Sequence, residues 1–122
     1  MPTILVVEDN KNQQLLYEEE LQREGYTIVT AFDGKDAIEK VKEKPPDLII
    51  LDINMPRMDG IETIGKILSQ HKQIPIIINT AYGSYKSSFM TWAADAYIVK
   101  SSDLSELKDK IKELLTNRPK DF

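Results

Sequence analysis

Five short runs rich in Val, Ile and Leu recur along the chain and constrain its fold more than any other feature of the sequence. They cover residues 4–7, 27–30, 48–51, 76–78 and 97–99. Most are apolar at consecutive positions, which is typical of strands buried on both faces of a parallel sheet. The run over 27–30 is the least apolar, so we expect that strand to lie at an edge of the sheet.

Helical patterns fill the intervals between these runs. The first helix is predicted over residues 12–24, with Leu15, Leu16 and Leu21 on its buried face and Gly25 as the residue that ends it. The second is predicted over 35–44 and is halted by the two prolines that follow. Its apolar face is formed by Ala37, Ile38 and Val41.

Three more helices complete the pattern. Ile61, Ile64, Ile67 and Leu68 mark one face of the third, and the fourth is predicted over residues 84–94. The last carries the clearest stripe, formed by Leu104, Leu107, Ile111, Leu114 and Leu115, with Asp103 and Glu106 spaced for a capping box. Alternating strands and helices predict an α/β fold of five βα units, with parallel strands, right-handed crossovers and helices on both faces. We expect residues 1–122 to form a single domain, with 117–122 as a tail or the start of a linker.

Composition excludes several classes of protein. The chain has 16 Lys and Arg against 20 Asp and Glu, a net charge of −4 that argues against nonspecific nucleic-acid binding. It has no cysteine, so thiolate chemistry and Cys-based metal sites are excluded, and His71 is its one histidine. No apolar run is long enough to span a membrane, and the first residues do not form a signal peptide. We therefore expect a soluble cytoplasmic domain that binds neither nucleic acid nor membrane directly.

Polar side chains follow the predicted strands where ligands bind in open α/β sheets. Glu8 and Asp9 follow the first strand, Asp52 the third, Thr80 comes at the end of the fourth, and Lys100 follows the fifth. Carboxylates this close repel one another unless a cation is present, and Mg²⁺ prefers such oxygen ligands. Together with a hydroxyl and an ammonium group, they indicate phosphoryl transfer, in which a carboxylate can be the nucleophile.

Four motifs in chain order resemble the receiver domains of two-component response regulators, and the resemblance covers essentially the whole chain. They are VVEDN at 6–10, LIILDINMPRMDG at 48–60, NTA at 79–81 and AYIVK at 96–100. The resemblance implies a flavodoxin-like, doubly wound (βα)5 fold with the strand order 2-1-3-4-5. It also implies a signalling switch that catalyses only its own phosphorylation and dephosphorylation.

The resemblance assigns the metal and acceptor roles residue by residue. Asp52 corresponds to the phosphoacceptor. Asp9, Asp52 and the backbone carbonyl of Asn54 correspond to the Mg²⁺ ligands, with Glu8 as an outer or water-mediated ligand. The phosphoryl donor is then a sensor histidine kinase or a histidine phosphotransfer protein, because His71 is expected to be exposed and uninvolved.

The resemblance also implies a switch. Thr80 corresponds to the hydroxyl that binds the new phosphoryl oxygens, Lys100 to the cation that pairs with them, and Tyr97 to the aromatic that turns inward. Phosphorylation is expected to change a partner-binding surface formed by the helix over 84–94, the strand over 97–99 and the last helix. Tyr85, Phe89 and Trp92, on the first of these helices, are expected either to complete the core or to form part of that surface.

One position departs from the family pattern. Receivers usually have a cis proline after the lysine, and this chain has Ser101. The peptide bond from Lys100 to Ser101 is therefore expected either to stay cis under strain or to be trans, and we expect a locally different loop after the fifth strand.

Other functions remain open at this stage. A receiver that only binds partners would need no phosphorylation, although Asp9, Asp52, Thr80 and Lys100 are all present. A haloacid dehalogenase-type phosphatase would need a second aspartate where Asn54 stands, and an FMN-binding flavodoxin would need a phosphate loop after the first strand. The sequence does not identify the output pathway, and either a monomer or a phosphorylation-dependent homodimer fits it.

Overall fold

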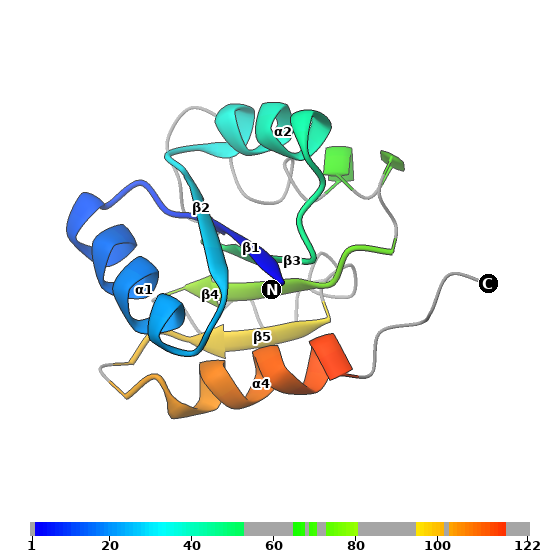
Figure 1. The fold of residues 1–122 in the computed structure, drawn as a ribbon. Coiled ribbons are helices and arrows are strands. Elements are labelled where there is room, and N and C mark those ends of the chain that lie inside the picture. The colour runs from blue at the N-terminus through cyan, green and yellow to red at the C-terminus, as the bar shows by residue number, and fades with distance from the viewer. Residues whose placement is uncertain are drawn as a thin grey trace.

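A parallel sheet with helices on both faces forms the described part of the chain (Figure 1). The computed structural model describes residues 2–52, 65–67, 69–70, 73–80, 95–101 and 103–116. In chain order its elements are β1 (Thr3–Val7), α1 (Lys11–Arg23), β2 (Thr27–Ala31), α2 (Gly34–Glu43), β3 (Leu48–Leu51), β4 (Ile76–Thr80), β5 (Ala96–Val99) and α4 (Ser105–Thr116).

The five strands lie in the order β2-β1-β3-β4-β5, and every neighbouring pair is parallel. This confirms the expected strand order and places β2 at an edge. Val7 pairs with both Ala31 and Leu51 at one end of the sheet, so the carboxyl ends of β1, β2 and β3 lie level with one another. The residues that follow these strands therefore share one edge of the sheet.

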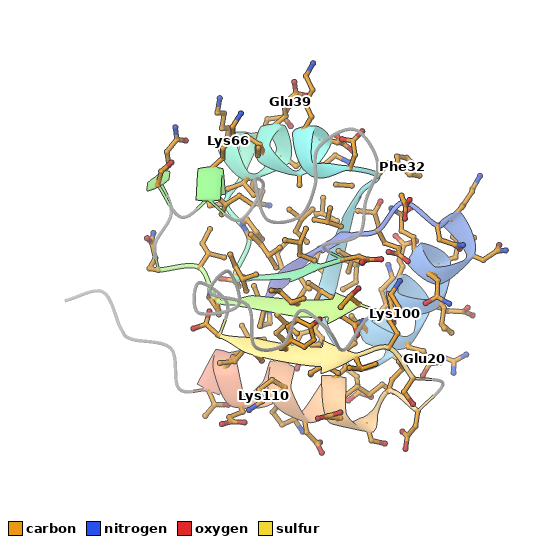
Figure 2. All side chains as sticks on the ribbon, turned by 180° about the vertical axis from the view of Figure 1, so that it is seen from behind. Glu20, Phe32, Glu39, Lys66, Lys100 and Lys110 are labelled. Atoms are coloured by element: carbon orange, nitrogen blue, oxygen red, sulfur yellow. The ribbon has the colours of Figure 1, made fainter. Side chains whose placement is uncertain are left out.

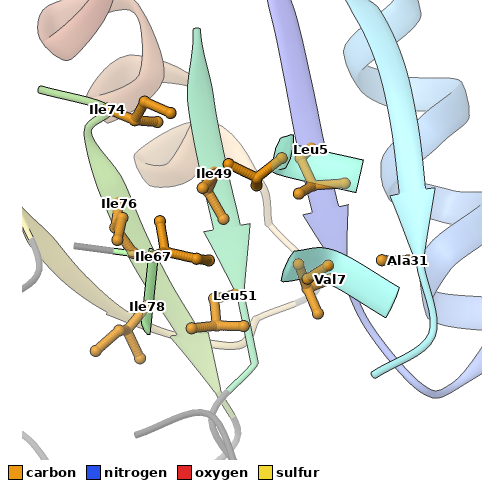
Figure 3. Close-up of a cluster of buried hydrophobic side chains, with 11 residues drawn as sticks. Leu5, Val7, Ala31, Ile49, Leu51, Ile67, Ile74, Ile76 and Ile78 are labelled. Carbon is orange, nitrogen blue, oxygen red and sulfur yellow. The ribbon is translucent and has the colours of Figure 1, made fainter. Parts of the chain in front are cut away.

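Each face of the sheet is covered by its own apolar cluster. On one face, Ala37 and Val41 of α2 and the buried Ile67 pack against strand residues such as Leu5 and Ile49 (Figure 3). On the other, α1 and α4 pack against Ile4, Val6, Leu48, Ile50, Ile77 and Ile98. Consecutive strand residues supply opposite clusters, which explains why residues 4–7 of β1 and all of β3 are apolar.

The buried face of α1 differs from the predicted one. Leu15 and Leu16 are 49% and 41% exposed, and the residues that face the sheet are Gln14, Tyr17 and Leu21. These three positions are spaced i, i+3 and i+7, so they form one helical stripe, and only Leu21 belonged to the expected set. The prediction was wrong because it counted apolar residues, whereas two side chains of the true stripe carry polar groups that find partners inside the protein.

The remaining helix boundaries follow local signals. Gly25 has a φ of 97°, the left-handed conformation expected of the residue that follows a helix end. Helix α2 begins after Asp33, whose side chain accepts from the backbone N–H of Asp36, and it ends before the two prolines. In α4, Leu107 and Ile111 are buried as predicted, but the capping box is not formed, since Asp103 accepts from Ser105 N–H instead.

Several predictions fall on residues outside the described ranges. They are the helix over 84–94 with Tyr85, Phe89 and Trp92, three residues of the third helix (Ile61, Ile64 and Leu68), His71 and the tail 117–122. Residues 65–67 and 69–70 are helical, and Ile67 is 2% exposed, in agreement with the third predicted helix. No described helix combines the length and apolarity that a membrane span requires.

Candidate functional site

The charged residues of the candidate site meet at the carboxyl edge of the sheet because the backbone ladder continues just past the strands. The backbone N–H of Glu8 donates to Ala31, and that of Asp52 donates to Val7. The backbone N–H of Lys100 donates to the Thr80 carbonyl over 2.8 Å. The backbone of each of these residues is thus held by a hydrogen bond to the adjacent strand, and their side chains come together at one edge of the sheet.

Lys100 bridges two of the carboxylates. Its Nζ donates to Glu8 Oε1 over 2.6 Å and to Asp52 Oδ2 over 3.0 Å. In Figure 2, Lys100 lies near the arrowheads of the strands, which mark the carboxyl ends of the sheet. The three side chains come from the ends of β1, β3 and β5, so the contact depends on the whole sheet being assembled.

Three carboxylates form a compact oxygen cluster. Glu8, Asp9 and Asp52 each offer one oxygen, and these oxygens lie within 4.8 Å of one another. Glu8 and Asp52 are 1% and 7% exposed, whereas Asp9 faces solvent. Glu8 Oε2 is buried and has no hydrogen-bond partner among the residues described. The cluster therefore has an exposed carboxylate, Asp9, and a buried carboxylate oxygen, Glu8 Oε2, without a hydrogen-bond donor among the described residues.

Burial and charge act against each other at this cluster. Burial is the main cause that raises the pKa of Glu8, the Lys100 ammonium lowers it and the neighbouring Asp52 carboxylate raises it, and together they bring this pKa from 4.5 to about 7. For Lys100, burial lowers the pKa, but the hydrogen bonds and charges of Glu8 and Asp52 outweigh burial and raise it. The lysine therefore stays charged, and Glu8 holds a proton more readily than an ordinary glutamate.

These groups fit a hard divalent cation. All the candidate ligand atoms are oxygens, as Mg²⁺ requires, and an added cation would satisfy the orphaned Glu8 Oε2 directly or through water. It would also offset the burial and, to a lesser degree, the repulsion from Asp52 that raise the pKa of Glu8.

Two other predicted residues are described. Thr80 is fully buried at the end of β4, beside the strand that carries Lys100. Tyr97 is partly buried and packs against the apolar cluster under α2. Asn54, the third predicted metal ligand, lies outside the described residues.

The peptide bond between Lys100 and Ser101 is trans, as are the other described peptide bonds. The trans bond still leaves Lys100 in contact with Asp52. Of the two alternatives that Ser101 left open, the structure has the trans form, and the lysine reaches the acid cluster without the usual proline.

Sequence reasoning missed three polar side chains around the site. Gln14 Nε2 donates to the carbonyls of Glu8 and Ala31 over 3.2 Å each, so α1 holds the ends of β1 and β2. Asn79 Nδ2 donates to Tyr17 Oη over 2.9 Å. The available signal was their position, since Gln14 and Tyr17 lie one turn apart on the helix that follows the Glu8–Asp9 pair.

Fold and site together define a class. This is a doubly wound α/β domain with acidic side chains and a lysine at the carboxyl edge of its sheet, where such folds bind their ligands. Residues 4–112 match the family model of the response regulator receiver domain. The chain belongs to this family.

Curated relatives agree with this assignment. The response regulator ArlR of Staphylococcus aureus is 38% identical over 120 residues, which are 98% of this chain and 55% of the relative. The chain thus spans about half the length of the curated relatives it matches.

Solved structures share the fold. The response regulator TrrA of Thermotoga maritima, in complex with Mg²⁺ and BeF, is 48% identical with a TM-score of 0.91, over 93% of this chain and 99% of that one. A complex of TrrA with the histidine kinase ThkA matches with 49% identity and a TM-score of 0.89, over 94% and 99% of the two chains. A receiver domain from Methanospirillum hungatei is 29% identical with a TM-score of 0.91, over 97% and 96%.

Proposed function

We propose that this domain is a phosphorylation-dependent switch in which Asp52 accepts a phosphoryl group from a histidine kinase or histidine phosphotransfer protein. An Asp52 carboxylate oxygen forms the new bond to phosphorus as the bond from phosphorus to the donor histidine nitrogen breaks. The observation that carries the proposal is Lys100 bound to both Asp52 and Glu8 within a cluster of three carboxylates.

The metal role falls to the same cluster. Asp9, Asp52 and the backbone carbonyl of Asn54 would hold Mg²⁺, with Glu8 as an outer or water-mediated partner. When bound, the ion would neutralise charge on the phosphoryl oxygens during transfer. The solved TrrA complex with Mg²⁺ and BeF, at 48% identity, supports this assignment.

Lys100 and Thr80 would respond to the new group. A phosphoryl group brings about −1.5 to −2 charges near neutral pH. Lys100 would exchange part of its contact with Glu8 and Asp52 for the phosphoryl oxygens, and the Thr80 hydroxyl would donate to one of them. The domain thereby catalyses its own phosphorylation and dephosphorylation and acts on no other substrate.

The output would be a changed protein-binding surface. β5 and α4 contribute to it together with residues 84–94, and Tyr97 would turn inward on phosphorylation. Val99 of β5, at the end of the strand order, is 43% exposed and would contribute an apolar side chain to this surface. The TrrA–ThkA complex supports a histidine kinase as the upstream partner, and a cytoplasmic location remains a prediction.

Acetyl phosphate tests the proposal without knowledge of the kinase. The protein is incubated with acetyl phosphate and Mg²⁺, and its intact mass is measured for the wild type, Asp52→Asn and Asp109→Asn. Asp109 is an exposed aspartate on α4 and serves as the matched control. We expect one phosphoryl adduct on the wild type and on Asp109→Asn, none on Asp52→Asn, and none when EDTA is added first.

Two results would contradict the proposal. An adduct of equal yield on Asp52→Asn would remove Asp52 as the acceptor. A wild type that gains no adduct would favour the alternative of a receiver that binds partners without phosphorylation.

A further inference from the structure

A buried hydrogen bond joins α1 to the carboxyl end of β4, the strand that carries Thr80. Asn79 Nδ2 donates to Tyr17 Oη over 2.9 Å, and the two residues are 3% and 2% exposed. They are 62 positions apart in the sequence. The bond therefore forms only when α1 is docked on the sheet, and it reports on the position of that helix.

The surroundings make this bond necessary for Asn79. Tyr17 belongs to the cluster with Leu21, Ile77 and Ile98 on the face of the sheet covered by α1 and α4. Asn79 is two residues after Ile77 on the same strand and points to this face. An amide buried among hydrocarbon side chains is costly unless it is bonded, so the end of β4 is held where Tyr17 can accept the bond.

Thr80 follows Asn79 directly and points to the other side of the strand. Its carbonyl accepts from the Lys100 backbone N–H over 2.8 Å, which ties it to β5. Residues 79 and 80 are thus fixed from two directions, by the Tyr17 phenol and by the strand that carries Lys100. A change at Tyr17 would be transmitted to Thr80 through one peptide unit.

The Tyr17 phenol also lies within electrostatic reach of the acid cluster. Burial raises its pKa, its bond with Asn79 lowers it, and the charges of Lys100, Glu8 and Asp52 act on it as well. The phenol is therefore close enough for the charges of the site to act on it, although it does not belong to the carboxylate–lysine cluster.

We propose that Tyr17 is a positioning residue that sets the direction of the Thr80 hydroxyl through Asn79, and so controls how fast Asp52 gains and loses its phosphoryl group. This rests on the function proposed above. Metal binding is left to the carboxylates, whereas the Tyr17 hydroxyl bonds to Asn79, so the rate and the Mg²⁺ requirement should respond separately.

The test compares Tyr17→Phe with Tyr26→Phe. The Tyr26→Phe substitution also removes a phenol hydroxyl, and Tyr26 packs against the same apolar cluster. Tyr26 immediately precedes Thr27 at the amino end of the sheet, whereas Thr80 lies at the carboxyl end. At a temperature where all variants are folded, we expect Tyr17→Phe to lower the maximal phosphorylation rate with acetyl phosphate by about 3- to 30-fold. The Mg²⁺ concentration for half-maximal rate should stay within about twofold of the wild type, and Tyr26→Phe should match the wild type in both.

A double variant separates positioning from general destabilisation. If Tyr17 acts through Asn79, then Asn79→Leu and Tyr17→Phe should slow the reaction to a similar extent, and the double variant should be no slower than either. Effects that multiply, or a Tyr17→Phe rate equal to that of Tyr26→Phe, would overturn the proposal.

A second measurement needs no phosphorylation. The methyl NMR resonance of Thr80 should shift in Tyr17→Phe and stay unchanged in Tyr26→Phe. An unchanged Thr80 resonance in Tyr17→Phe would overturn the positioning role even if the wild type is phosphorylated normally. A shifted resonance in a protein that gains no phosphoryl group would instead contradict the proposed function and leave the positioning contact supported.

Discussion

Glu8 is a buried acid of the site whose ionised form is costly to keep inside the fold. It is 1% exposed, one of its oxygens has no hydrogen-bond partner among the described residues, and burial raises its pKa to about 7. Lys100 compensates only in part, because its single ammonium also binds Asp52. An acid held in this way weakens the fold when ionised and favours the binding of a cation.

Replacement of Glu8 should therefore change how stability depends on pH. The folded pKa is raised from 4.5 to about 7, so between these values the folded state binds more protons than the unfolded state. The contribution of Glu8 to the free energy of unfolding thus falls as pH rises through this window. In EDTA, Glu8→Gln should gain stability relative to the wild type between pH 5 and pH 8, by up to about 3 kcal/mol.

Urea unfolding at pH 5 and pH 8 measures this difference. Glu39→Gln, an exposed glutamate on α2, is the matched control and should follow the wild type at both pH values. A difference between Glu8→Gln and the wild type that does not change with pH would show that Glu8 titrates as an ordinary acid.

At the scale of elements, α1 fastens the strand ends as well as covering the sheet. Gln14 holds the carbonyls of Glu8 and Ala31, and Tyr17 accepts from Asn79. One turn of this helix therefore contacts the ends of β1, β2 and β4. The exposed Leu15 and Leu16 lie on other sides of the same turn.

Loss of the Gln14 amide should loosen two strand ends together. Gln14→Leu keeps a similar side-chain volume but leaves the two carbonyls without that donor, so we expect a loss of about 1–3 kcal/mol in the free energy of unfolding. Gln22→Leu is the control, because Gln22 is exposed on the same helix. Chemical denaturation measures the free energy of unfolding of both variants. Equal stability of the two would contradict the stabilisation that we assign to the hydrogen bonds of Gln14.

The sequence predicted some elements better than others for physical reasons. β1, β3 and β4 are buried on both faces, so their continuous apolar runs locate them directly, and the charged residues after them locate the edge of the sheet. The face of α1 could not be predicted in this way. Its stripe includes Gln14 and Tyr17, whose polar atoms are satisfied by strand ends distant in sequence, and a pattern of apolar residues carries no record of such partners.

The site shows the same division. Glu8, Asp52 and Lys100 could be grouped from the sequence because each directly follows a strand of one parallel sheet. The trans peptide at Ser101 and the orphaned oxygen of Glu8 could not, since both depend on atomic positions after folding. The capping box predicted for α4 is absent for a similar reason, because the Asp103 carboxylate accepts from the backbone N–H of Ser105 and not from that of Glu106.

At the scale of the whole molecule, the sheet makes one reactive edge from distant segments. Glu8 and Lys100 are 92 positions apart and are joined by a direct contact. The central claim is that Asp52 carries the phosphoryl group. It is supported by this contact, by membership of the receiver family and by the parallel strand order β2-β1-β3-β4-β5.

Chemical mapping of the modified residue tests that claim most directly. An acyl phosphate is reduced by borohydride, which converts a phosphorylated aspartate to homoserine. After incubation with acetyl phosphate and Mg²⁺, borohydride treatment and proteolysis, peptide sequencing by mass spectrometry should find homoserine at position 52 and aspartate at positions 9 and 109. Homoserine at another position, or at none, would contradict the assignment of Asp52 as the phosphoacceptor.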